Sequence, residues 1–219
     1  MSIGIKNQAV VVLDLDDTLY EELAYLKSGF RQIADFIISH RFRDPYEELL
    51  SAYFKSGDPL QTLIDRYGYP FTISQLLDIY RHHMPDIRLR VGAENFLDQL
   101  KNKRYTAGLM TDGRSVSQRN KIKALGIAHY FSDIIVSEEF GSTKPALRNY
   151  QYFMDKYPGR TYCYIGDNFE KDFIAPNKLG WMTIGFEENS HQIHPRSESL
   201  GSEYFPQFTI SSFDEIILM

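Results

Sequence analysis

The sequence predicts an α/β protein built on a doubly wound parallel sheet, with an all-helical segment inserted after the first strand. Two observations support this prediction. Apolar, β-branched runs alternate with helical patterns over about 130 residues, which is typical of parallel α/β sheets. The alternation is interrupted between residues 21 and 86, where helical patterns follow one another without a convincing strand.

The apolar run Val10–Leu13 is continuous, which is typical of a strand that is covered on both faces. Further strands are expected over residues 105–110, 133–136, 161–165, 181–184 and 207–210. Helices are expected between them over residues 94–103, 115–125, 146–156 and 169–179. Gly126 and Gly180 follow two of these helices, at the position where a helix commonly ends in glycine. Residues 187–205 are rich in polar residues and are expected to form an exposed loop.

The inserted segment begins with an amphipathic pattern over residues 21–40. Shorter helices are expected over residues 45–54, 59–67 and 72–82. Pro45 and Pro59 stand near the starts of two of them, and Thr72 is the expected N-cap of the third. The aromatic residues of this segment are expected mainly to pack a small helical core.

Charged residues near the return from this segment are Arg81, Arg88 and Arg90, beside His82 and His83. Adjacent histidines on a helix point in different directions, so we expect no joint metal site there. An arginine in this region could contact a second anionic group of a substrate, but a solvated position is the expected one.

Composition narrows the class of function. The 219 residues carry 24 Lys and Arg against 29 Asp and Glu, a net charge of −5, which argues against a general nucleic-acid binder. Neither a membrane-spanning run nor a signal peptide is expected, so a cytoplasmic location is predicted. The single cysteine, Cys163, cannot form an intramolecular disulfide and is expected to be a buried strand residue.

Three acids follow the first strand directly: Asp14, Asp16 and Asp17. Ligands of parallel sheets bind beyond the carboxyl ends of the strands. Carboxylates this close repel one another unless a positive group offsets them, and Mg²⁺ is a natural candidate. The alternative is a cluster at a helix start, with Asp17 or Thr18 as the capping residue.

Polar residues also follow three later strands. Gly166-Asp167 and Asp172 form a second acidic pair, of which helix capping would explain Asp172 better than Asp167. Thr111, Asp112 and Gly113 offer a hydroxyl and backbone N–H groups that suit a phosphate oxygen, although Thr-Asp-Gly is also ordinary turn sequence. Lys144 stands before a further helix, where alone it would be taken as a surface charge.

Together these segments resemble the haloacid dehalogenase superfamily of phosphohydrolases over nearly the whole chain. Asp14-x-Asp16-x-Thr18, Thr111, Lys144 and Gly166-Asp167-xxxx-Asp172 match its four motifs in order. The resemblance implies a Rossmann-like catalytic core over residues 1–20 and 87–219, and a helical cap over residues 21–86. It points to the capped phosphatases that act on small molecules.

The resemblance also implies roles for these residues. Asp14 would attack phosphorus and form an aspartyl-phosphate, while Asp16 would act as general acid and then as general base. Mg²⁺ would be held by Asp14, the Asp16 backbone carbonyl and Asp167. Lys144 would bridge the nucleophile and a phosphate oxygen, and Thr111, with the amides of Asp112 and Gly113, would hold another. Asp172 would either bind the metal through water or orient Lys144.

The acid at position 16 favours phosphate esters, because a halide leaving group needs no proton. The expected partner is therefore a small phosphate ester, with neither nucleic acid nor membrane involved. Two alternatives are a phosphomutase of the same superfamily and a non-catalytic phosphate-binding protein that keeps the fold. A metal-dependent turnover assay and an analysis of products separate these three functions.

Overall fold

A six-stranded parallel sheet forms the body of the molecule in the computed structural model, which describes residues 2–187 and 200–219. The strand order is β4-β3-β2-β5-β6-β7. The strands are β2 (Val10–Leu13), β3 (Thr106–Thr111), β4 (Asp133–Val136), β5 (Tyr162–Gly166), β6 (Met182–Phe186) and β7 (Phe208–Ile210). Every pairing is parallel, so the predicted doubly wound α/β class is confirmed.

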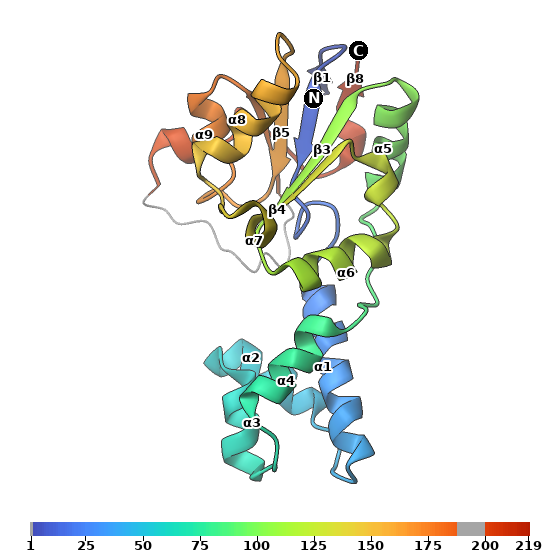
Figure 1. Cartoon of the computed structure of the whole chain (residues 1–219), viewed down its shortest axis with the longest axis vertical. Helices are drawn as coiled ribbons and strands as arrows, with labels where there is room; N and C mark the ends of the chain where they lie inside the picture. The colour runs from blue at the N-terminus through green and yellow to red at the C-terminus, as the bar shows by residue number, and fades with distance from the viewer. Residues whose placement is uncertain (1, 188–199) are drawn as a thin grey trace.

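Strand β2 is buried on both faces because alternate side chains enter two separate apolar cores. Val11 and Leu13 enter the core beneath α5 (Ala93–Asn102) and α6 (Ser115–Leu125). Val10 and Val12 enter the core beneath α8 (Leu147–Lys156) and α9 (Ile174–Lys178). The two pairs of helices flank the sheet in Figure 1. A central strand of this kind can carry an apolar run without alternation.

The position of β2 also explains where a ligand would bind. The chain continues from β2 to β3 on one side of it and later places β5 on the other side. Such a reversal of strand order leaves a crevice beyond the carboxyl ends of the strands. Asp14 follows β2 at this point, and Asp167 follows β5.

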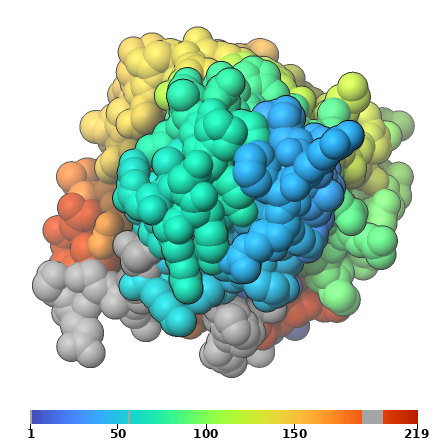
Figure 2. Space-filling view, turned by 90° about the horizontal axis from the view of Figure 1, so that it is seen from below, coloured from blue at the N-terminus to red at the C-terminus, as the bar shows by residue number. Residues whose placement is uncertain are grey.

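Between β2 and α5 the chain forms a four-helix unit, α1 to α4, that lies beyond this end of the sheet (Figure 1). The helices are α1 (Glu22–Ser39), α2 (Tyr46–Ser56), α3 (Pro59–Tyr67) and α4 (Ile73–His82). Figure 2 looks onto this unit and shows α1, in blue, beside the green segments of α3 and α4. All four helices occur where the sequence predicts them.

The four-helix unit has an apolar core of its own, which includes Phe30, Ile33, Leu49, Leu63 and Leu76. Aromatic side chains pack within it as expected from the sequence. The ring centroids of Phe36 and Phe71 lie 4.9 Å apart, and those of Phe42 and Tyr69 also lie 4.9 Å apart. The predicted cap at Thr72 is confirmed, because its side chain accepts a hydrogen bond from the backbone of Gln75.

The prediction of a helix over residues 169–179 is wrong in its start, because α9 extends only over Ile174–Lys178. Proline has no N–H, so Pro176 cannot donate to the carbonyl of Asp172 as a continuous helix would require. The hydroxyl of Tyr150 donates to that carbonyl instead, at 3.3 Å. The preceding residues are thereby available for a loop at the edge of the sheet.

A second, two-stranded parallel sheet pairs β1 (Ile3–Ile5) with β8 (Ile216–Leu218), and the sequence analysis missed it. Its residues are few, and their pairing joins the two ends of the chain, which no local pattern reveals. The Tyr105 hydroxyl donates to the carbonyl of Met219 at 2.7 Å and supports this sheet. The remaining short elements are α7 (Ser137–Phe140), η1 (Ala128–Tyr130), η2 (Ser202–Tyr204) and η3 (Phe213–Glu215).

Cys163 is buried in β5, as predicted. The loop expected over residues 187–205 lies largely outside the described residues. Among the helices described, none combines the length and apolar character that crossing a membrane requires.

Gly29 permits the close contact between α1 and α4. A Cβ atom at this position would lie 2.4 Å from two ring carbons of Tyr80. We expect Gly29→Ala to reduce the free energy of unfolding by about 1–3 kcal/mol, because overpacking displaces well-packed side chains. Chemical denaturation measures the change, and Lys27→Ala on the exposed side of α1 is the control. Equal stability of Gly29→Ala and the control would contradict this packing.

Candidate active site

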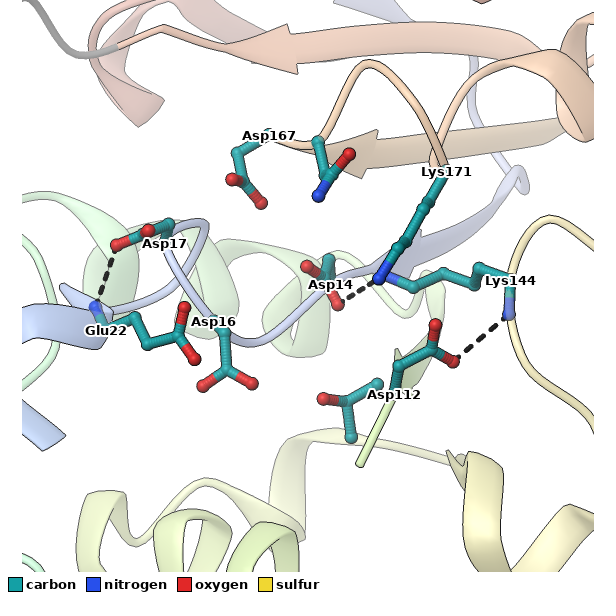
Figure 3. Close-up of a pocket in the computed structure, with 10 residues that line it drawn as sticks. Asp14, Asp16, Asp17, Glu22, Asp112, Lys144, Asp167 and Lys171 are labelled. Atoms are coloured by element: carbon teal, nitrogen blue, oxygen red, sulfur yellow. Dashed lines mark hydrogen bonds and ion pairs between the residues drawn. The ribbon is translucent and has the colours of Figure 1, made fainter. Parts of the chain in front are cut away.

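Most of the sequence-predicted site residues meet in one pocket beyond the carboxyl ends of the strands (Figure 3). The pocket has a volume of about 160 Å³. Its lining residues are Asp14, Asp16, Asp17, Glu22, Thr111, Asp112, Lys144, Asp167, Asn168 and Lys171. Four separate strand ends therefore supply one site, as the sheet topology requires.

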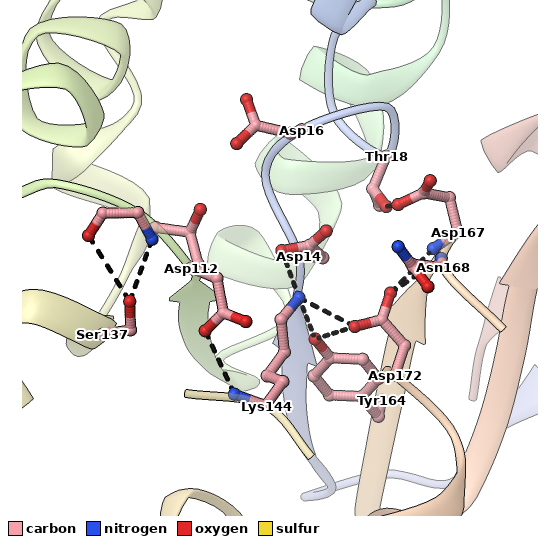
Figure 4. A network of polar contacts seen from close by, with 12 residues as sticks. Asp14, Asp16, Thr18, Asp112, Ser137, Lys144, Tyr164, Asp167, Asn168 and Asp172 are labelled. Atoms are coloured by element: carbon pink, nitrogen blue, oxygen red, sulfur yellow. Dashed lines mark hydrogen bonds and ion pairs between the residues drawn. The ribbon is translucent and has the colours of Figure 1, made fainter. Parts of the chain in front are cut away.

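Lys144 is the centre of the polar contacts behind this pocket (Figure 4). Its Nζ atom lies 2.7 Å from Asp14 Oδ1 and 2.7 Å from Asp172 Oδ1. It also donates to the Tyr164 hydroxyl at 3.2 Å. Burial alone would lower the pKa of Lys144, but the charges of Asp14 and Asp172 raise it well above its usual value. Lys144 is therefore a fixed buried cation, and the interpretation as a surface charge is wrong.

Asp172 holds Lys144 and also closes the loop that follows β5. Its Oδ2 accepts the backbone amides of Asp167 at 3.1 Å and Asn168 at 2.9 Å. This carboxylate therefore binds amides that precede it, whereas a helix cap would bind those that follow. A Cβ atom at Gly166 would lie 2.4 Å from Asp172 Oδ2, so glycine is what allows this approach.

The buried carboxylates of this site form an electrostatic arrangement that suits a cation. Asp14, Asp167 and Asp172 each offer an oxygen, and these atoms lie within 4.8 Å of one another. Burial raises the pKa of Asp14 to about 7, although Lys144 opposes the change. Burial together with the charges of Asp14 and Asp172 raises the pKa of Asp167 well above its usual value. A divalent cation would reverse both shifts because it favours the ionised carboxylates.

The donor set also indicates which carboxylates are available to such a cation. Asp172 is occupied by Lys144, by Tyr164 and by the two backbone amides. Asp14 and Asp167 line the pocket, and their oxygens are the hard ligands that Mg²⁺ prefers. Thr18 donates to Asp167 Oδ1 at 3.2 Å and so holds this side chain in place.

Asp16 lies on the other side of the pocket, and both of its oxygens accept hydrogen bonds. Lys121 Nζ lies 2.7 Å from Oδ1, and Gln118 Nε2 lies 2.8 Å from Oδ2. The Tyr20 hydroxyl also donates to Oδ1. Burial alone would raise the pKa of Asp16, but these three donors and the charge of Lys121 outweigh burial and lower it.

Gln118 and Lys121 are not among the residues predicted from the sequence. A signal was present, because two polar residues three positions apart share one face of a helix that packs on the sheet. Both side chains are buried. Their partner is Asp16, more than a hundred residues earlier in the chain, so local sequence could not identify it.

The expected phosphate-binding residues are only partly found at the pocket. Thr111 and Asp112 line it, but Gly113 does not. The Gly113 amide donates to Ser137 Oγ at 2.9 Å, which differs from the expected role in holding phosphate. Asp112 Oδ1 also accepts the Lys144 backbone amide at 3.1 Å and so ties two strand ends together.

Asp17 shapes the chain where it leaves the sheet for α1. It adopts a left-handed conformation with φ of 52°, and its Oδ1 accepts the Glu22 amide at 2.8 Å. Arg90 Nη2 donates to the Asp17 carbonyl at 3.0 Å, and only 9% of the Arg90 side chain is exposed. The expectation of a solvated position is therefore wrong for Arg90.

Glu22 is a further pocket residue that the sequence analysis missed. It is the first residue of α1, so it belongs to the four-helix unit. Its carboxylate lies among the acids of the site (Figure 3). Burial, together with the charges of Asp16 and Asp17, raises the pKa of Glu22 to about 7.

Comparisons with known proteins agree with this architecture. A glyceraldehyde 3-phosphate phosphatase of Methanocaldococcus jannaschii is 24% identical over 94% of both chains. A phosphoserine phosphatase of Thermus thermophilus is 25% identical over 71% of this chain and 66% of its own. The crystal structure of the HAD-hydrolase YfnB of Bacillus subtilis, bound to magnesium, superposes with a TM-score of 0.68 at 20% identity. That match covers 95% of this chain and 96% of the other.

The haloacid dehalogenase-like hydrolase family matches residues 11–186, which include all four strand ends of the pocket. The relatives named phosphatases agree with the acids and the lysine gathered there. The chain belongs to the haloacid dehalogenase-like hydrolases.

Proposed function

We propose that this protein is a Mg²⁺-dependent phosphatase that hydrolyses a small phosphorylated metabolite through an aspartyl-phosphate. The observation that carries the proposal is the buried ion pair of Asp14 with Lys144, at 2.7 Å, in the lining of a small pocket. A carboxylate beside a fixed cation can approach an anionic phosphate with less repulsion. The names of the phosphatase relatives support the same substrate class.

Asp14 is the proposed nucleophile. A carboxylate oxygen attacks phosphorus, the bond from phosphorus to the ester oxygen breaks, and an aspartyl-phosphate forms. Lys144 neutralises charge on the transferring phosphoryl group, while Thr111 and the Asp112 amide are proposed to bind another of its oxygens. Asp172 orients Lys144 through the contact at 2.7 Å.

Asp16 is the proposed general acid and base. An in-line displacement places the leaving oxygen on the side of phosphorus opposite the nucleophile. The Asp16 carboxylate is turned away from Asp14 (Figure 4), which is consistent with a place on that opposite side. It would give a proton to the leaving alcohol and then remove one from the water that hydrolyses the aspartyl-phosphate.

Mg²⁺ fits the buried acids of the site, and Asp14 and Asp167 are the side chains proposed to hold it, with the Asp16 backbone carbonyl. When bound, the ion would offset the charge of carboxylates that otherwise repel phosphate. The magnesium in the related Bacillus subtilis hydrolase supports this choice of ion.

The four-helix unit is the proposed cap, over residues 21–86, with the catalytic core over residues 1–20 and 87–219. Glu22, the first residue of α1, forms part of the lining of the pocket, so the four-helix unit reaches the site. Closure of the cap would exclude water and disfavour bulky substrates such as phosphoproteins. Five relatives named glyceraldehyde 3-phosphate phosphatase support a compact substrate.

A panel of phosphorylated metabolites tests the proposed function, with inorganic phosphate and organic products measured together. We expect phosphate release without a bisphosphorylated activator, fastest with compact esters. An isomerised sugar phosphate that appears faster than free phosphate would instead indicate a mutase. No metal-dependent turnover on any ester would indicate a non-catalytic protein.

The first prediction concerns the nucleophile. Asp14→Asn should abolish turnover and leave the fold intact, because an amide cannot replace the attacking carboxylate. Phosphate release and thermal unfolding measure the two effects, and Asp155→Asn on an exposed position of α8 is the control. A rate above about a tenth of wild type, a loss of only about 1.4 kcal/mol, would contradict a covalent role.

The second prediction concerns the metal. EDTA should abolish activity, and Asp167→Ala should raise the Mg²⁺ concentration needed for turnover. The same site predicts a pH dependence of stability. Without a cation the pKa of Asp14 in the folded protein is about 7, above the ordinary 3.8. The protonated carboxyl therefore stabilises the fold at low pH, and this contribution is lost as the pH rises through about 7. Because Mg²⁺ binds the deprotonated carboxylate, adding Mg²⁺ should raise the melting temperature more at about pH 8 than at about pH 5.5. Full activity in EDTA would exclude the proposed site.

The third prediction concerns substrate choice by Glu22. At about pH 8, above its pKa of about 7, the Glu22 carboxylate is mostly ionised and should disfavour substrates with a second negative group. Glu22→Gln should therefore raise kcat/KM for phosphoglycolate relative to glycerol 3-phosphate by about fivefold, the effect of about 1 kcal/mol between charges. Activity on p-nitrophenyl phosphate and the exposed control Glu47→Gln should show no such change. An unchanged ratio would remove Glu22 from substrate selection.

A further inference from the structure

Lys121 is a buried cation that the steps above do not use. It lies on α6, and only 5% of its side chain is exposed. A lysine is seldom buried to this degree unless its charge is paired. The pairing here is with Asp16, whose Oδ1 lies 2.7 Å from Lys121 Nζ.

The contacts of Asp16 are divided unequally between its two oxygens. Oδ1 accepts from both Lys121 and Tyr20, whereas Oδ2 accepts from Gln118 at 2.8 Å. The donors come from α6 and from the chain just before α1, so they hold the carboxylate from two directions. A carboxylate bound in this way has one orientation, and Oδ2 is the oxygen with more capacity to carry a proton.

Lys121 is itself fixed by contacts on the side facing the four-helix unit. Its Nζ atom lies 4.1 Å from the centre of the Tyr25 ring, a cation–π distance. The same helix binds the end of α4, because Asn120 Nδ2 donates to the carbonyls of His82 and His83, each at 3.1 Å. Lys121 is therefore packed between the sheet and the proposed cap, where its side chain has little freedom to turn away from Asp16.

We propose that Lys121 is a positioning residue for the acid–base carboxylate of Asp16. By holding Oδ1, it presents Oδ2 to the substrate. The anionic phosphate of a bound substrate would favour the protonated carboxyl of Asp16, so Oδ2 would take up a proton from solvent. That proton would pass to the leaving oxygen as its bond to phosphorus breaks, and Oδ2 would then accept a proton from the attacking water. This inference rests on the proposed function, since it assigns Lys121 to the acid–base step of that reaction.

The leaving group provides the first test. Alkyl phosphates need a proton on the departing oxygen, whereas p-nitrophenolate leaves without one. In single-turnover experiments, Lys121→Met should slow cleavage of glycerol 3-phosphate by about tenfold or more, a part of the usual gain from acid catalysis. Release of p-nitrophenolate in the first turnover should change by less than about threefold, because that step bypasses the acid.

A double-mutant cycle provides the second test. If Lys121 acts through Asp16, Lys121→Met should slow cleavage of the alkyl phosphate in the otherwise wild-type protein. The same substitution should have little further effect on that rate in an Asp16→Asn background. Lys121→Arg keeps the charge and should restore a large part of the alkyl phosphate rate. Lys123→Met, on an exposed position of the same helix, is the control and should behave as wild type.

Melting temperatures separate positioning from loss of structure, since removing one partner of a buried pair can destabilise the fold. If Lys121→Met does not fold, the comparison of Lys121→Arg with wild type on the two leaving groups decides the question. Equal losses on both leaving groups, or additive losses in the cycle, would overturn the positioning role. Wild-type protein inactive on every ester would instead overturn the proposed function.

Discussion

The structure of this site depends on placing several carboxylates in a buried crevice where they repel one another. Asp14, Asp167 and Asp172 bring oxygens within 4.8 Å, and Lys144 lies 2.7 Å from two of them. Burial raises the pKa values of Asp14 and Asp167, and the neighbouring acids that one lysine does not neutralise add to this increase. Because three acids face one lysine, a further cation at this site would be stabilised by the remaining negative charge.

The architecture of the sheet makes this crowding possible. β2 lies between β3 and β5, so residues that follow these strands converge at one edge. The loop after β5 is then fixed by Asp172, whose approach requires a glycine at position 166. A side chain at position 166 would displace the Asp172 carboxylate, and it would therefore also disturb Lys144, which Asp172 orients.

The two acids of the proposed reaction are treated differently by their surroundings. Burial raises the pKa of Asp14. The pKa of Asp16 is lowered, because the contacts with Lys121, Gln118 and Tyr20 outweigh its burial. A bound cation would lower the pKa of Asp14, and the anionic phosphate of a bound substrate would raise the pKa of Asp16, which favours the ionised nucleophile and the protonated acid that the proposed reaction uses. The helix α6 supplies two of the donors to Asp16 and also contacts the end of α4, which connects the chemistry to the four-helix unit.

Sequence alone determined the elements whose signals are local. The continuous apolar run before Asp14 and the order of four polar strand ends predicted the sheet, the family and most of the pocket residues. The proline and threonine starts predicted the inserted helices. Tertiary structure decided contacts between distant segments: Lys121 with Asp16, Arg90 with Asp17, β1 with β8, and Asp172 as the partner of Lys144. It also directed the Gly113 amide to Ser137, away from the expected phosphate contact. The physical reason is that a strand or helix signal is carried by neighbouring residues, whereas the partner of a buried charge is set by which segments the fold brings together.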